Sequence, residues 1–131
     1  MEKGNYYFKT IVGIPYVQAV EKVREALAEE GFGVLTEIDV KAILKKKLDV
    51  DFKPYIILGA CNPPLAYKTL QIEEQIGLML PCNVVVQEGE DGKTLVSAIS
   101  PEDVMRPVGN EELEPVAGEV SERLQRVLEA L

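Results

Sequence analysis

The sequence predicts an α+β domain whose antiparallel or mixed sheet is covered by helices on one face. The first observation is the order of elements, which is a strand, a helix, four further strands with helical segments between them, and a long final helix. The second is a hairpin signal directly before that final helix. The third is the absence of a repeat or linker in a chain of 131 residues. Residues 1–131 therefore form a single domain.

The first strand is predicted at residues 6–12, which are rich in aromatic and β-branched residues. Gly13 ends this strand, and Pro15 stands where a helix begins. The helix shows apolar residues at helical spacing: Tyr16, Ala19, Val20, Val23, Ala26 and Leu27. Gly31 ends the helix, and residues 32–38 predict a second strand. Phe32, Val34, Thr36 and Ile38 are expected to lie on one face of this strand.

A short helix is predicted after Asp39, whose carboxylate suits an N-cap. Its expected inward residues are Val40, Ile43, Leu44 and Leu48. The last turn is Lys45-Lys46-Lys47, where each cation opposes the negative end of the helix dipole and contributes about 0.3–1 kcal/mol. We favour this structural interpretation over an anion-binding patch, because a functional basic site usually contains more than one cluster.

The second half of the chain begins with an apolar strand at residues 54–60, which we expect to lie inside the sheet. Asn62 and Pro63 then predict the N-cap and first turn of a helix. A further helical turn is expected at residues 73–80. Strands follow at residues 82–88 and 94–99, joined by a turn at residues 90–92, and residues 100–103 resemble a capping box. The final amphipathic helix begins between residues 110 and 115.

The composition restricts the classes of function. The 14 basic and 22 acidic residues give a net charge of −8, which disfavours binding to nucleic acid or to an anionic membrane. No stretch approaches the roughly 20 apolar residues of a membrane span. The N-terminus lacks the layout of a signal peptide. We therefore expect a cytoplasmic protein with reduced thiols.

The usual catalytic motifs are absent, so the sequence favours a protein that is not an enzyme. It contains no phosphate-binding loop, no dinucleotide-binding glycine motif and no G-x-S-x-G. It also contains no histidine, which removes the commonest general base and transition-metal ligand. Glu37 and Asp39 lie on one strand face, about 6.8 Å apart along the strand. We interpret them as a solvated strand end and a helix cap.

The two cysteines, Cys61 and Cys82, are 21 positions apart, which does not match a C-x-x-C metal site. Cys61 precedes a helix N-terminus, which would lower the pKa of its thiol. However, Pro63 and Pro64 lack the N–H donors that would stabilise an anion there. A parallel arrangement of the flanking strands would place the two cysteines at opposite edges of the sheet. An antiparallel arrangement would place them at the same edge.

Three segments resemble the family called domain of unknown function 302. They are GFGVLTEID (residues 31–39), YIILGACNP (55–63) and GLMLPCNVVV (77–86). The resemblance covers residues 6–105 and extends in layout to the final helix. It implies a fold similar to one repeat of the TATA-binding protein, a two-layer β-α-β(4)-α sandwich whose curved, mostly antiparallel sheet packs on a long C-terminal helix. It implies no established reaction, so no catalytic residue is transferred.

This resemblance selects the antiparallel arrangement. It implies that Cys61 and Cys82 share an edge with Asn62 and Pro81, with Cα atoms within about 7 Å, the reach of a disulfide. The candidate ligand-binding residues are Cys61, Asn62, Cys82 and Tyr55. The two cysteines are also the only candidate metal ligands, and the sequence names no cofactor. Despite the likeness to a DNA-bending fold, the acidic charge disfavours DNA binding.

Three functions are compatible with these observations. The first is a binding module for a small molecule, a thiol ligand or a metal ion, with Cys61 and Cys82 at the rim of its pocket. The second is a homodimer in which a partner covers the bare face of the sheet. The third is a thiol-dependent enzyme that uses Cys61. The sequence favours them in this order.

Overall fold

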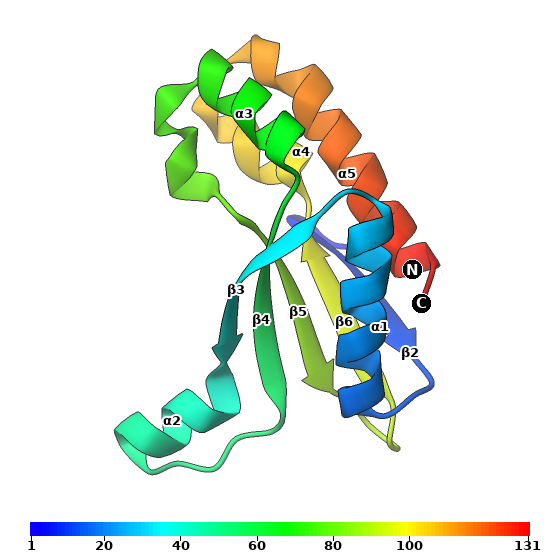
Figure 1. Ribbon diagram of the computed structural model, residues 1–131. Helices are drawn as coiled ribbons and strands as arrows, with labels where there is room; N and C mark the ends of the chain where they lie inside the picture. The colour runs from blue at the N-terminus through cyan, green and yellow to red at the C-terminus, as the bar shows by residue number, and fades with distance from the viewer.

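The computed structural model describes all 131 residues and contains one six-stranded sheet with the order β1-β2-β6-β5-β4-β3 (Figure 1). The strands are β1 (Glu2–Lys3), β2 (Tyr7–Val12), β3 (Gly33–Asp39), β4 (Tyr55–Cys61), β5 (Cys82–Glu88) and β6 (Thr94–Ile99). Every neighbouring pair is antiparallel. The antiparallel arrangement of the strands that carry the cysteines is thereby confirmed. Strand β1 was not predicted, because two charged residues carry no periodic signal.

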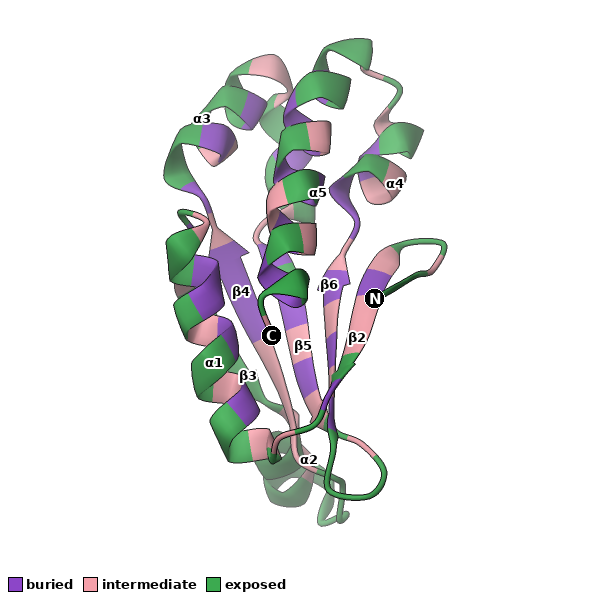
Figure 2. Ribbon diagram, turned by 90° about the vertical axis from the view of Figure 1, so that its right-hand side faces the viewer, coloured by how far each residue is buried: buried purple, intermediate pink, exposed green.

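The helices gather on one face and at the two ends of the sheet. The α-helices are α1 (Tyr16–Glu29), α2 (Val40–Leu48), α3 (Pro63–Ile72), α4 (Pro101–Met105) and α5 (Glu114–Glu129). Three 3₁₀ turns are η1 (Glu74–Met79), η2 (Arg106–Val108) and η3 (Glu111–Leu113). Helices α1 and α5 cover one face, α3 and α4 lie beyond one end of the strands, and α2 lies beyond the other (Figures 1 and 2). The α+β class is confirmed.

The core lies between the sheet and helices α1 and α5. Alternate residues of β5 and β6 are buried, because successive side chains of a strand point to opposite faces (Figure 2). The fully buried residues of this layer include Leu58, Val84, Val86, Val96, Val23, Leu27, Leu124 and Val127. The opposite face of the sheet has no helical layer. None of the helices is long and apolar enough to cross a membrane.

The predicted caps of α2 and α3 are confirmed. The Asp39 carboxylate accepts a hydrogen bond from the Ala42 N–H at 3.0 Å, and the Asn62 side chain accepts one from the Leu65 N–H at 3.3 Å. Ser100 behaves differently from the expected capping box. Its hydroxyl donates to the Asp103 carboxylate at 2.6 Å and caps no backbone N–H of α4.

The prediction that Phe32, Val34, Thr36 and Ile38 share one strand face is wrong, because β3 contains a bulge. Val34 pairs with Ala60, whereas Thr36 pairs with Gly59, so Leu35 is the extra residue. One extra residue reverses the alternation of side chains beyond it. Val34 therefore packs against the core, while Thr36 lies on the uncovered face beside Gly59, where a Cβ atom would collide with the Thr36 hydroxyl.

The expected burial of the apolar residues of α2 is also wrong. The helix forms where the sequence predicts it, but none of its residues is buried, and Ile43 and Leu48 are exposed. The reason is its position beyond the end of the sheet, where no second layer covers it (Figure 1). Lys45–Lys47 do form its last turn, and Lys45 pairs with Asp49 and Asp51.

Truncation of the core should cost far more free energy than truncation at the surface. We expect Leu124→Ala to lower the free energy of unfolding by about 2–5 kcal/mol, because Leu124 is fully buried between α5 and the sheet. Leu78→Ala is the matched control, since Leu78 is highly exposed, and it should change stability by less than about 0.5 kcal/mol. Urea unfolding measures both. Equal effects would contradict this description of the core.

Candidate functional site

A predominantly apolar cavity of about 280 Å³ lies at the end of β4 and the start of β5, beside α3 and α5. Twelve of its 15 lining residues are hydrophobic, and none is charged. Its lining includes Cys61 and Cys82 from the strands, Leu65 and Leu70 from α3, Met105 from α4 and Val120 from α5. Segments that are distant in the sequence therefore line one partly open, mainly apolar space.

The antiparallel pairing of β4 and β5 brings both cysteines to this cavity. Cys82 is directly opposite Ala60, the residue before Cys61, so the two cysteines are one register step apart on adjacent strands. Both thiols are free. Cys82 points to the core side and is only 7% exposed, whereas Cys61 at the strand end is half-buried. The sequence-predicted pair thus lines one site.

The Cys82 thiol is held in its neutral form. Burial, with a further contribution from the neighbouring Cys61, raises the pKa of the Cys82 thiol from 9.0 to about 11. Desolvation penalises the thiolate because an apolar cavity cannot solvate its charge. At neutral pH, Cys82 is therefore a weak, polarisable hydrogen-bonding group rather than a nucleophile.

Asn62 is buried beside the cysteines, but both ends of its amide are used to hold the fold together. The side-chain oxygen caps α3, and the side-chain nitrogen donates to the Glu30 carbonyl at 3.4 Å. Arg123 of α5 donates to the same carbonyl at 3.0 Å. The end of α1 is thus linked to both α3 and α5. Asn62 positions the wall of the cavity and leaves its thiols as the available polar groups.

Two further features show how closely this junction is packed. Gly31 follows α1 with a φ of +83°, and a Cβ atom there would lie 2.9 Å from the Asn62 side-chain nitrogen. The second buried polar residue of the lining, Thr69, donates its hydroxyl to the Leu65 carbonyl at 2.8 Å. Its polar group is therefore also satisfied within α3.

Tyr55 does not belong to this site, so its assignment as a candidate ligand-binding residue is corrected. It begins β4, whereas Cys61 ends the strand, and at about 3.3 Å per residue six positions separate them by roughly 20 Å. Tyr55 instead lines a hollow on the uncovered face of the sheet together with Tyr6 and Tyr7. The sequence prediction grouped Tyr55 with Cys61 without taking into account the length of the strand that separates them.

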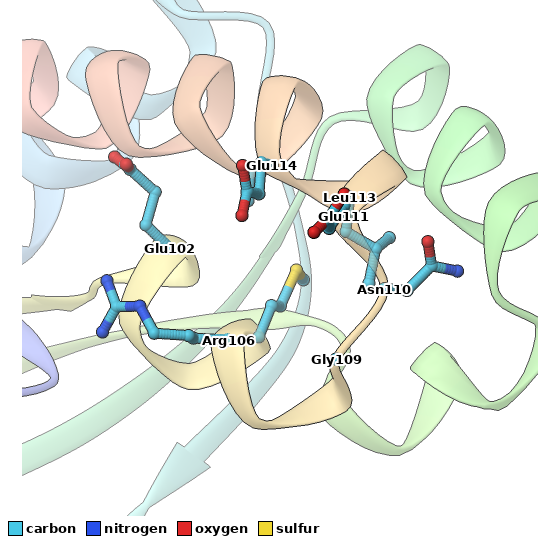
Figure 3. A pocket seen from close by; sticks show the side chains of 9 residues that line it. Glu102, Arg106, Gly109, Asn110, Glu111, Leu113 and Glu114 are labelled. Atoms are coloured by element: carbon cyan, nitrogen blue, oxygen red, sulfur yellow. The ribbon is translucent and has the colours of Figure 1, made fainter.

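A second, polar cavity of about 310 Å³ borders the first and shares Met105 and Ala117 with it. Figure 3 shows Glu102, Arg106 and Glu114 among the side chains that line this cavity. The Arg106 guanidinium is 3.2 Å from the Asp103 carboxylate, which it pairs with. Nowhere in the chain do three or more histidine, cysteine or acidic side chains gather as a metal site. Cys61 and Cys82 accordingly have no third protein ligand.

The apolar lining was only partly evident from the sequence. The helical spacing of Leu65, Ala66 and Leu70 is typical of one inward helix face, and all three line the cavity. Leu70 also remains partly exposed at its rim. The contributions of Ala117 and Val120 were missed, because the periodicity of the last helix does not say which of its inward residues meet the sheet and which meet α3.

The fold and the cavity define a small α+β domain with an apolar pocket and no recognisable catalytic set. The family model "Domain of unknown function DUF302" matches residues 8–131, and the chain belongs to this family. It is similar to the crystal structure of an uncharacterized conserved DUF302 protein from Bacillus stearothermophilus, with 30% identity, a TM-score of 0.88, and coverage of 95% of this chain and 96% of that one. No curated protein matches the chain.

The raised pKa of Cys82 predicts a loss of stability at alkaline pH. Between pH 9 and about 11 the unfolded chain releases the Cys82 proton while the folded chain retains it, so the free energy of unfolding falls as the pH rises. The full difference corresponds to about 3 kcal/mol. Urea unfolding under reducing conditions measures it, with Cys82→Ala as the control. Parallel pH profiles for the two proteins would contradict the assignment.

Proposed function

We propose that this protein binds a small, uncharged and mainly apolar molecule in the cavity beside Cys61 and Cys82. The observation that supports the proposal is the cavity lining, which contains 12 hydrophobic residues of 15 and no charged side chain. Mainly apolar clefts and cavities with a few polar groups are typical of small-molecule sites. The polar groups of Asn62 and Thr69 are already hydrogen-bonded, so the thiols are the side-chain groups that remain to orient a ligand.

The size and polarity of the cavity restrict the ligand. Its volume of about 280 Å³ is nearly twice the roughly 150 Å³ of an engineered apolar cavity that binds benzene. This volume suits a molecule with one or two rings or a short branched chain. A charged group would lose its hydration inside the cavity without gaining a protein partner. The net charge of −8 further disfavours anions.

The two thiols suit recognition better than catalysis. A neutral thiol is a weak donor, and its polarisable sulfur packs favourably against aromatic rings. A thiol-dependent enzyme would need a thiolate and a base to form it, but Cys82 is held neutral and the chain contains no histidine. We therefore assign both cysteines to ligand contact, in the reduced form expected of a cytoplasmic protein.

Binding can be tested with Prodan (6-propionyl-2-dimethylaminonaphthalene), an uncharged two-ring fluorophore that brightens in apolar surroundings. We expect saturable binding at one site per chain. Ala66→Phe should weaken it at least about tenfold, because the added ring occupies the cavity that Ala66 lines. Ala28→Phe, at an exposed position of α1, is the matched control and should bind as the wild type does. Circular dichroism confirms that each variant is folded.

Alkylation of Cys61 gives an independent measure of where the probe binds. Cys61 is half-buried at the cavity, so N-ethylmaleimide should modify it more slowly when the fluorophore is saturating. Peptide mass spectrometry follows each cysteine separately. Absence of saturable binding, or equal affinity of the wild type and the Ala66→Phe variant, would overturn the proposal. Unchanged alkylation of Cys61 at saturation would place the fluorophore elsewhere.

A further inference from the structure

The uncovered side of the sheet, which we call the bare face, presents apolar side chains interspersed with a few polar ones. It consists of the outward side chains of β2, β4, β5 and β6, among them Tyr7, Ile11, Tyr55, Ile57, Val85 and Leu95. Ile57 is opposite Val85, and Leu95 is opposite Ile11. Ser97 lies opposite Val85, and Gln87 lies opposite Leu95, so each row across the strands also contains a polar side chain. Ile11 is 70% exposed. An uncovered sheet face with this many large apolar side chains is typical of an interaction surface.

The bare face is also nearly free of charge. A shallow hollow of about 410 Å³ lies on it, and Lys9 is the only charged residue among the 11 that line this hollow. The whole chain carries a net charge of −8, so most of its surface repels a second copy. The bare face is the region where two copies can approach with the least repulsion.

Residues 40–54, which we call the arm, extend this surface beyond the end of the sheet. The arm contains α2 and the segment that leads into β4, and no residue of α2 is buried. Its apolar side chains Ile43, Leu48, Val50 and Phe52 are exposed. The Phe52 ring lies 6.0 Å from the Tyr55 ring, measured between centroids, so the arm and the bare face form one surface.

The charge of the arm is opposite to that of the remaining chain. It contains five lysines and two aspartates, a net charge of +3, so the rest of the chain carries −11. Lys46 and Lys47 form no ion pair within the chain. A basic arm on an acidic body is complementary to a second copy of itself. Nucleic acid and anionic membranes would be repelled by the much larger acidic part.

From these observations we infer that the bare face and the arm form the interface of a symmetric homodimer, in which each arm reaches the acidic body of the partner. Packing the two sheets face to face buries these apolar side chains of both copies. A two-fold axis that runs across the strands places each arm beyond the opposite end of the partner sheet. This arrangement keeps the two positive arms apart, and it makes the interface isologous.

Sedimentation velocity of the full chain at 1 and 50 µM in 50 mM NaCl tests the inference. At 50 µM, we expect the mass derived from the sedimentation of the wild type to be twice its 14.5 kDa chain mass. Ile11→Asp should weaken dimerisation at least about a hundredfold, because it places a carboxylate in an apolar interface. Val17→Asp is the control, since Val17 is 73% exposed on α1, away from the bare face, and this variant should remain dimeric. Circular dichroism verifies the fold.

The arm is tested separately by charge reversal. We expect the double variant Lys46→Glu/Lys47→Glu to dimerise more weakly, and 500 mM NaCl to weaken the wild-type dimer more than that of the variant. A monomeric wild type at 50 µM, or an Ile11→Asp variant as dimeric as Val17→Asp, would overturn the interface. If dimerisation does not depend on the salt concentration, the arm is not part of the interface. Fluorophore binding to Ile11→Asp should be unchanged, which separates this inference from the proposed function.

Discussion

The structure depends on the fact that its sheet is covered on one face only. Because side chains alternate along each strand, the cover provided by α1 and α5 divides the residues of β5 and β6 into a fully buried set and an outward set. The buried set, with Val84, Val86 and Val96, forms the core. The same division leaves an apolar surface that the chain itself does not cover. The buried core and the uncovered surface thus arise from one arrangement.

The apolar cavity arises where this cover ends. Helix α3 begins immediately after β4 and cannot lie over the sheet, so it spans the space between the strand ends and α5. The Glu30 carbonyl fixes that geometry, because Asn62 and Arg123 both donate to it from different elements. Such a shared acceptor holds three helices at a fixed separation while their apolar side chains leave a space between them. The site is therefore a property of the junction rather than of a single motif.

The sequence predicted the elements well where local chemistry marks their ends. Pro81 and the turn at Asp91-Gly92 delimit the last two strands, which the structure confirms at residues 82–88 and 94–99. The bulge at Leu35 could not be predicted, because it is a relation between two strands rather than a feature of one. The exposure of α2 likewise could not be predicted, because it depends on whether another element packs against this helix. The placement of Cys61 and Cys82 at the same edge of the sheet followed from the family resemblance. The misplacement of Tyr55 came from neglecting distance along a strand.

The bulge in β3 and the shortness of β1 have a consequence for the two outer borders of the sheet. Strand β3 forms one border, where Leu35 interrupts the row of backbone donors and acceptors and Glu37 and Asp39 add charge. The other border is β1, a strand of only two residues, both charged. Short, bulged or charged outer strands are poor templates for adding a further strand. Fibre-like growth by lateral strand pairing is thereby discouraged, even though the chain carries a broad apolar surface.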